Sequence, residues 1–330
     1  MKRIEILDYG NPEDVARCVE YADPPPPGMG EILIEVLAFP INPADIAFCK
    51  GNYASRPPLP AVPGAECVAR VQLVGEGVSG LHRGDLVISA LRENWMTHRV
   101  LREFDVIRIP PDSDLRQAAM LRINPPTAEL MLTDIIDLSP GDWVIQNAAN
   151  SAVGRMVIAF ARQKGLKTVN VVRRQDAIDG LYSLSGDVCL VDGPDLASRV
   201  REATAGAPMR LALDAISGDA TLRLGQCLSD GGTVANYGAM SETPAHFGTA
   251  ELVFRGITLR GFLRASSLAR FDQCGLELLY SDLSNRLKRL ACEAPVIATL
   301  PMDDIRDALR LAQEPARAGK VIVTTGAESL

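Results

Sequence analysis

The chain has 330 residues, of which 47% are hydrophobic and 23% charged, and a formal net charge of −7. This length is about twice that of a common domain (~150 residues), which predicts two domains or one large α/β unit. No apolar run approaches the ~18 residues that a membrane span requires, so we expect that the chain is not a membrane protein. An acidic chain without a basic run also argues against nucleic acid as a partner.

The N-terminal stretch MKRIEILDYGNPEDV contains acidic side chains and no apolar core. Secretory signals need such a core and transit peptides avoid acids, so we expect a cytoplasmic protein. The seven cysteines are dispersed without a C-x-x-C pair, which predicts reduced and mostly buried thiols. His82, His98 and His246 are far apart with no carboxylate at motif spacing, which argues against a hydrolase triad or a histidine metal site.

The first part of the chain, residues 1–123, is rich in proline and glycine. Three short strand candidates lie within it: EILIEVLAF, CVARVQLVG and GDLVISAL. Short strands separated by turn-forming residues predict a compact β-rich domain.

The middle of the chain, residues 124–263, contains six short apolar runs about 20 to 25 residues apart: DWVIQN, KTVNVV, DVCLV, RLALDA, GTVANY and TLRGF. Between the first two lies AVGRMVIAFARQKG, whose apolar residues recur at helical spacing and which Gly165 closes. Apolar strands that alternate with helix-sized intervals predict a parallel sheet covered on both faces. We therefore expect a doubly wound domain here.

The last part of the chain, residues 264–330, combines two helical patterns with one strand pattern. It contains a long helical pattern, SLARFDQCGLELLYSDLSNRLKRLA, then a second helix, DDIRDALRLAQ, and a final strand, GKVIVTT.

The stretch QNAANSAVG follows the first apolar run of the middle domain, where a dinucleotide-binding protein has its glycine-rich turn. The standard turn has three glycines: one for a tight turn, one for close approach of the backbone to pyrophosphate, and one for helix packing. Only the last is present here, as Gly154. Small or polar residues take the other places, and Asn147, Asn150 and Ser151 offer donors to phosphate oxygens. Backbone amides at the helix start remain available. A nucleotide site and a merely tight turn stay open as alternatives.

Arg173 and Arg174 end the next strand candidate, and Arg173 lies 19 residues after Gly154. NAD-dependent enzymes usually have an acid near this point, which binds the ribose hydroxyls. Two guanidinium groups instead suit the 2′-phosphate of NADP. The spacing after the turn favours NADP over two solvated arginines.

Several stretches together carry a resemblance to a known family: INPADIAFCKGNYASRPPLPAVPGAE, GLHRGDLVI, RINPPTAELML, LSPGDWVIQNAANSAVG, VVRRQD, LRGF and GKVIV. The chain resembles the medium-chain dehydrogenase/reductase superfamily, and within it the NADPH-dependent trans-2-enoyl-thioester reductases. The resemblance implies an α/β fold with a GroES-like β-rich catalytic domain, residues 1–123 and 264–330, and a Rossmann-type doubly wound parallel sheet, residues 124–263. It places the active site in the cleft between them.

The resemblance also implies an enzyme without zinc. Zinc-dependent members carry a cysteine shortly before the Asp of the NPAD-like segment and a histidine in a G-H-E motif. Here those places hold Pro43 or Ala44 and, in GAE, Ala65, and the four-cysteine lobe is missing.

For the cofactor, the resemblance implies NADP(H) lying at the switch point of the sheet, with its nicotinamide near Thr127 and the NYGAM turn. The expected cofactor contacts are Asn147, Asn150, Ser151, Ala152, Val153, Gly154, Arg173, Arg174, Thr127, Tyr237, Gly238, Ala239, Phe262, Leu263 and Lys320. The turn departs from the family pattern at Ala152, where a glycine is usual. Leu263 stands where the enoyl branch often has a tryptophan.

Tyr53 matches the catalytic tyrosine of the family. It is expected to stabilise charge on the carbonyl oxygen after hydride reaches the β-carbon. Asn42, Trp95 and Leu263 are the expected substrate-pocket residues, and Asn42 and Trp95 have a structural alternative. The substrate is expected to be a thioester of coenzyme A or acyl carrier protein, and the assembly a homodimer.

Two other functions remain open from the sequence. One is a quinone or enone oxidoreductase of the same superfamily. The other is a non-catalytic NADPH-binding sensor or structural protein, which Leu263 and the altered turn favour and Tyr53 disfavours.

Overall fold

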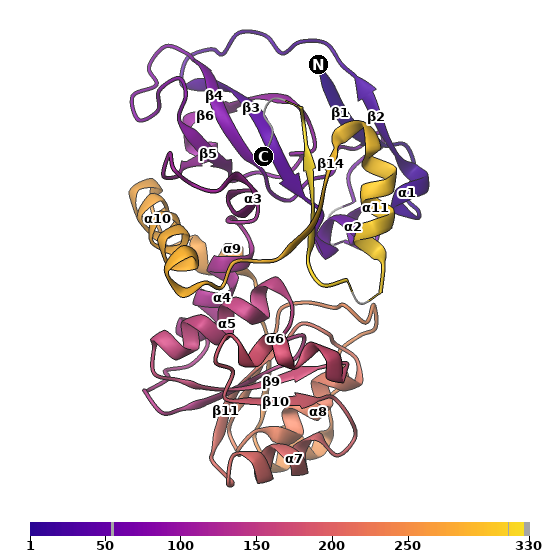
Figure 1. Ribbon diagram of the computed structural model, residues 1–330, viewed down its shortest axis with the longest axis vertical. Coiled ribbons are helices and arrows are strands. Elements are labelled where there is room, and N and C mark those ends of the chain that lie inside the picture. Colours follow the sequence, from indigo (N-terminus) through magenta and orange to yellow (C-terminus); the bar gives the residue numbers. More distant parts are fainter. Residues whose placement is uncertain (54–55, 316, 327–330) are drawn as a thin grey trace. The chain divides into compact units, whose positions relative to one another are not determined.

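Figure 1 shows a computed structural model of the chain, which describes residues 1–53, 56–315 and 317–326. The described chain forms two compact units. The first comprises residues 1–123, 271–286 and those from Ala294 onward, and the second residues 124–270 and 287–293. Residues 264–270, which the sequence analysis placed with the first unit, belong to the second. Within that unit Arg270 forms an ion pair with Asp134 at 2.6 Å.

The second unit is built on a six-stranded sheet of order β10-β9-β8-β11-β12-β13, in which every neighbouring pair is parallel. Its strands are β8 (Trp143–Gln146), β9 (Lys167–Val172), β10 (Val188–Val191), β11 (Met209–Asp214), β12 (Thr233–Asn236) and β13 (Thr258–Gly261). All six apolar runs of the sequence are thus strands. The order reverses between β8 and β11, which makes this the switch point of a doubly wound sheet.

Helices cover both faces of this sheet, with α5 on one side and α7 and α8 on the other (Figure 1). Their bounds are α4 (Asn124–Thr133), α5 (Ala152–Gln163), α6 (Asp179–Tyr182), α7 (Leu196–Ala203), α8 (Asp219–Cys227) and α9 (Arg264–Leu268). Short 3-10 or π turns lie at η2 (Gln175–Ala177) and η3 (Ala250–Phe254). The predicted apolar face of α5 is buried, including Met156, Val157 and Phe160.

The first unit contains a seven-stranded sheet of order β14-β15-β3-β4-β5-β7, with β6 also paired to β3. Its strands are β3 (Glu31–Pro40), β4 (Val68–Val74), β5 (Leu86–Ser89), β6 (His98–Arg102), β7 (Val106–Arg108), β14 (Val296–Pro301) and β15 (Lys320–Thr324), and a hairpin adds β1 (Lys2–Ile6) and β2 (Ala16–Glu20). The helices are α1 (Pro12–Val15), α2 (Pro43–Cys49), α3 (Leu115–Ala118), α10 (Gln273–Leu290) and α11 (Ile305–Gln313), with 3-10 turns η1 (Glu103–Asp105) and η4 (Met302–Asp304). Residues 287–290 of α10 belong to the second unit.

The C-terminal helical pattern is interrupted, because α9 and α10 are separate helices. Asp272 starts the second one, since its carboxylate accepts a hydrogen bond from the Gly275 amide at 2.8 Å, as an N-cap does. None of the described helices is long and apolar enough to cross a membrane.

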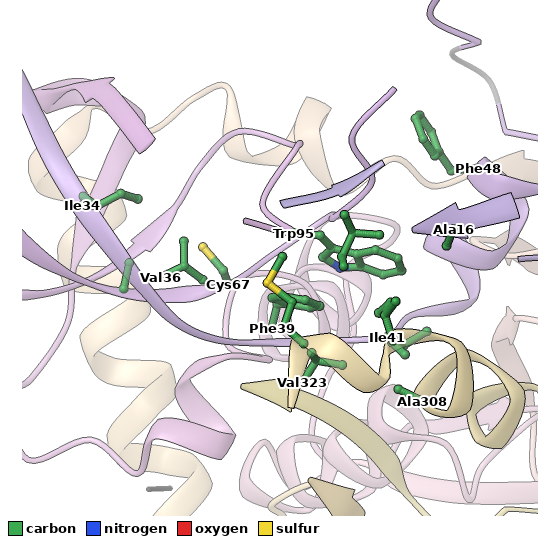
Figure 2. Packing of buried hydrophobic residues seen from close by; sticks show 14 of the residues in the cluster. Ala16, Ile34, Val36, Phe39, Ile41, Phe48, Cys67, Trp95, Ala308 and Val323 are labelled. Atoms are coloured by element: carbon green, nitrogen blue, oxygen red, sulfur yellow. The ribbon is translucent and has the colours of Figure 1, made fainter. Parts of the chain in front are cut away.

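The core of the first unit lies between its large sheet and α11. Phe39 and Trp95 stack there with ring centroids 5.4 Å apart, and Ile41 and Val323 pack nearby (Figure 2). Trp95 is completely buried. This position supports the structural alternative for Trp95 over a role in lining a substrate pocket.

Candidate cofactor and catalytic sites

The turn between β8 and α5 keeps its tight shape with a single glycine. Ser151 caps α5, and its hydroxyl accepts a hydrogen bond from the Gly154 amide at 3.1 Å. A Cβ at Gly154 would lie 2.5 Å from the carbonyl oxygen of Ala149, so no larger residue fits there. Ala148 adopts a φ of 47°, in the left-handed region that a glycine would occupy without strain. Gly154 therefore keeps the packing function of the fingerprint, and Ala148 supplies the turn.

The start of α5 presents hydrogen-bond donors at the end of β8. The amides of Ala152 and Val153 lie in the first turn, where helix geometry provides no intrahelical acceptor. Asn150 is exposed just before the cap, and Ser151 is half-buried. These groups form the kind of helix N-terminus that binds phosphate in nucleotide-binding folds.

Asn147 is directed into the protein, not toward a ligand. Its amide nitrogen donates to Asp214 at 2.6 Å, and its amide oxygen accepts from the Ala215 amide at 2.8 Å. The side chain is buried. Contrary to the sequence-based expectation, both ends of this amide are engaged within the second unit.

Asp214 is a residue that the sequence analysis missed. It ends β11 and is fully buried, and its carboxylate accepts five hydrogen bonds, from Asn147, Ile216, Ser217, Thr221 and Asn236. Two of these donors come from the ends of the neighbouring strands β8 and β12. Asp214 therefore holds together the carboxyl ends of three strands, the edge where open α/β sheets bind ligands. A lone acid after the apolar run RLAL was the available signal.

The two arginines follow β9, the strand next to β8, so they lie at the same edge of the sheet as the turn. Both are exposed. Arg174 forms an ion pair with Asp176 at 3.0 Å. Arg173 has no ion-pair partner in the described part of the chain, which leaves its guanidinium available to an anion.

The other expected cofactor residues of the second unit divide between two strand ends and a helix. Tyr237, Gly238 and Ala239 follow β12, and the buried Tyr237 hydroxyl has no hydrogen-bond partner among the described residues. Burial raises the pKa of Tyr237. Phe262 and Leu263 follow β13, Leu263 with 67% of its surface exposed.

Thr127 does not follow a strand. It is buried in α4.

Lys320 and Asn42 lie together in the first unit. The Lys320 ammonium donates to the Asn42 amide oxygen at 2.5 Å, and the Asn42 amide nitrogen donates to Glu66 at 2.9 Å. All three side chains are buried. Burial lowers the pKa of Lys320 to about 8, although the negative charge of Glu66 acts to raise it. The side-chain amide of Asn42 is therefore engaged at both ends, as a link between a buried acid and a buried base.

Glu66 is a further residue that sequence reasoning did not identify. Its second oxygen accepts from the Ile123 amide at 2.9 Å. Burial raises the pKa of Glu66, whereas Lys320 and Asn42 act to lower it. The network joins α2, the segment before β4 and β15, which are far apart in the sequence.

Tyr53 lies after α2 and is half-buried against the core of the first unit. The guanidinium carbon of Arg92 lies 4.4 Å from the centroid of its ring. Among the described residues its hydroxyl has no hydrogen-bond partner. A ring packed against Arg92, with a hydroxyl that no described residue engages, suits a donor directed at a substrate.

Two family models match parts of the chain. Residues 28–101 match the alcohol dehydrogenase GroES-like domain, and residues 152–281 match the model described as zinc-binding dehydrogenase. The mitochondrial enoyl-[acyl-carrier-protein] reductase of Homo sapiens is 36% identical over 331 residues, which cover 98% of this chain and 89% of that protein. The chain belongs to the medium-chain dehydrogenase/reductase superfamily. Its GroES-like and Rossmann-type architecture is thereby confirmed.

Solved structures agree with this assignment to the medium-chain dehydrogenase/reductase superfamily. A putative NADPH:quinone reductase from Bacillus thuringiensis is 27% identical with a TM-score of 0.89, and the alignment covers 98% of each chain. The complex of Etr1p with NADP and crotonyl-CoA is 25% identical with a TM-score of 0.83, covering 98% of this chain and 99% of that one.

The superfamily includes zinc enzymes, so the metal-ligating side chains are of interest. Within residues 1–53, 56–315 and 317–326, no three His, Cys, Asp or Glu side chains gather as metal ligands.

Proposed function

We propose that this enzyme reduces the activated carbon–carbon double bond of a trans-2-enoyl thioester, with NADPH as the hydride donor. The main support is the likeness, over 98% of the chain, to a protein named enoyl-[acyl-carrier-protein] reductase. The half-buried Tyr53, whose hydroxyl has no hydrogen-bond partner among the described residues, would supply the donor that such a reaction needs. Hydride adds to the β-carbon, the electron pair of the double bond moves to the carbonyl oxygen, and a proton then reaches the α-carbon.

The second unit is proposed to bind NADPH at the carboxyl edge of its sheet. The first-turn amides of α5 and the hydroxyl of Ser151 would hold the pyrophosphate. Arg173 and Arg174 would hold the 2′-phosphate, because a guanidinium donates several directed hydrogen bonds to phosphate oxygens. Tyr237, Gly238, Ala239, Phe262 and Leu263 would lie along the rest of the cofactor, as would Thr127 of the same unit.

Tyr53 is proposed to donate its hydroxyl hydrogen to the carbonyl oxygen as negative charge develops there. A phenol is protonated at neutral pH and needs no metal ion to act as a donor. The protein is accordingly proposed to work without zinc. Elemental analysis should find less than stoichiometric zinc, and activity should survive a chelator; one zinc per active chain would refute this.

A quinone or enone reductase is the second candidate function, because the structure with a TM-score of 0.89 is named as a putative NADPH:quinone reductase. The exposed, aliphatic Leu263 is compatible with either substrate class. NADPH oxidation with enoyl-CoA thioesters of several lengths, a quinone and an enone separates the two. The enoyl-reductase proposal expects the highest kcat/KM with a thioester, and a clear preference for the quinone would replace it.

The acyl carrier is proposed to be coenzyme A or acyl carrier protein, because the relatives are named with one or the other. The assembly is proposed to be a homodimer, as expected from the sequence. The compartment proposed from the sequence is the cytoplasm, although the relative from Homo sapiens is named as mitochondrial. Cell fractionation of the native source would decide between these compartments.

A further inference from the structure

Arg92 is a partly buried arginine beside Tyr53, and it has no role in the proposed reaction so far. Its guanidinium carbon lies 4.4 Å from the centroid of the Tyr53 ring and 5.6 Å from that of Phe48. Its Nη2 atom is buried, and no described residue accepts a hydrogen bond from it. Leaving a buried charged donor without an acceptor costs free energy, which a bound acceptor would recover.

Arg92 lies in the loop of residues 90–97 between β5 and β6. Hydrogen bonds to backbone carbonyls hold this loop in place. The guanidinium of Arg99 donates to the Arg92 carbonyl. The Asn94 amide donates to the carbonyls of Leu91, at 2.7 Å, and Gly64, at 3.3 Å. A Cβ at Gly64 would lie 2.6 Å from the Asn94 nitrogen, so only glycine allows this approach. The position of Arg92 is therefore set in advance by the fold of the first unit.

The charge of Arg92 is not neutralised by a direct partner. No carboxylate in the described part of the chain forms an ion pair with it. Its positive charge does act on the buried Asp45, where it opposes the desolvation that raises the pKa of that carboxyl. The Asp45 oxygens are themselves engaged by the amides of Asn42 and Ala65, at 2.9 and 2.8 Å. A guanidinium with an unengaged hydrogen therefore lies beside the proposed donor.

We propose that Arg92 is a second catalytic donor, whose Nη2 hydrogen bonds to the same carbonyl oxygen of the substrate that Tyr53 serves. This inference rests on the proposed function. Two donors on one oxygen stabilise an enolate more than one, because charge on that oxygen is largest in the transition state and after it. A cationic donor adds charge stabilisation that the neutral phenol lacks. The ligand class is an α,β-unsaturated carbonyl compound whose oxygen becomes an oxyanion on hydride addition.

A double-mutant cycle separates this role from mere support of the Tyr53 ring. The variants are Arg92→Met, Tyr53→Phe and the double variant, with kcat and KM measured on the best substrate and NADPH affinity measured by fluorescence. Arg92→Met is expected to lower kcat by about 10²-fold and to leave NADPH affinity unchanged. In the Tyr53→Phe background it should still lower kcat by about tenfold or more, because the phenylalanine ring remains and the guanidinium still reaches the oxygen.

A purely supporting Arg92 would act only through the Tyr53 hydroxyl, so the loss in the Tyr53→Phe background would vanish. That outcome, or an unchanged kcat of Arg92→Met, would overturn the proposal. Arg92→Lys tests it in a second way, since it keeps the charge and a donor and should recover part of the lost kcat. An Arg92→Lys variant no more active than Arg92→Met, although equally well folded, would also count against it.

Arg56→Met is the matched control, because the Arg56 guanidinium carbon lies 4.5 Å from the ring centroid of Tyr9 in the same unit. The kcat of Arg56→Met should equal that of the wild type. A loss of kcat as large as that of Arg92→Met would show that removing any arginine stacked on a tyrosine in this unit lowers kcat. Wild-type turnover tests the proposed function independently. If the wild type prefers a quinone to the thioester, the cycle on the quinone still tests Arg92, because hydride addition to a quinone also leaves an oxyanion.

Discussion

The side-chain amide of Asn147 donates a hydrogen bond of 2.6 Å to the buried carboxylate of Asp214. This bond joins the end of β8 to the end of β11, the two strands between which the order of the sheet reverses. The Asn147 side chain therefore connects two strands below the proposed cofactor-binding edge, and is not itself available to the cofactor. The donors that we propose for phosphate are the first-turn backbone amides of α5 and the side chains of Asn150 and Ser151.

Asp214→Ala should destabilise the second unit. The substitution leaves the buried side-chain donors of Asn147 and Thr221 without their carboxylate acceptor. Losing hydrogen bonds to a charged group costs ~1.5 to 3 kcal/mol each. We expect the free energy of unfolding in urea to fall by about 3 kcal/mol or more. Asp230→Ala is the control, because that exposed acid forms a surface ion pair with Arg255. Losing this pair should lower the free energy of unfolding by at most about 1 kcal/mol. Equal losses for the two variants would refute the organising role.

Arg173→Ala should weaken NADPH binding by about tenfold or more and leave NADH binding almost unchanged. Only NADPH carries the 2′-phosphate, and a charge-assisted hydrogen bond to it is worth ~1.5 to 3 kcal/mol. Fluorescence titration of both cofactors measures this. Arg201→Ala, an exposed arginine of α7, should change neither affinity. Equal affinity of the wild type for NADH and NADPH would contradict the assignment of both arginines.

Tyr53→Phe should lower turnover by about 10²-fold, or ~2.7 kcal/mol of barrier, because the lost donor acts on charge that appears mainly in the transition state. NADPH affinity should stay unchanged, since the proposed cofactor contacts of the sheet edge lie in the second unit. Steady-state kinetics and a fluorescence titration give the two quantities. Unchanged turnover would return Tyr53 to a packing role.

The protein should be a homodimer in solution. Strand β13 is an edge of the six-stranded sheet, and an isologous pairing of two such edges is a closed assembly. Leu252, Val253 and Phe254, just before this strand, are 45%, 66% and 82% exposed. Light scattering should give twice the mass of the chain, and Phe254→Glu should shift it toward the monomer. A wild-type monomer at micromolar concentration would contradict this.

The sequence predicted the elements of the second unit because each strand is a continuous apolar run and α5 has a clear apolar face. It could not predict the direction of the Asn147 side chain, because the partner Asp214 follows 67 residues later and only the parallel sheet brings them together. The position of Arg92 over Tyr53 likewise depends on a loop contact between distant segments.

The elements that sequence patterns missed were short or interrupted. The strands β1 (KRIEI), β2 (ARCVE) and β14 (VIATLP) are each at most six residues long. Even where their apolar residues alternate, as in β1 and β14, the run is too short to stand out in the sequence. The break before α10 depends on one capping contact of Asp272. Family resemblance identified Tyr53, whereas its surroundings required the structure.

Isotope transfer tests the central claim most directly. The enzyme is supplied with a trans-2-enoyl-CoA thioester and NADPH deuterated at C4, with each of the two C4 epimers in turn, and the product is examined by NMR. We predict a saturated thioester that carries deuterium at the β-carbon from one epimer only, with the new α-hydrogen coming from solvent. A product without cofactor deuterium at the β-carbon, or no saturated thioester while NADPH is bound, would contradict the proposed reduction.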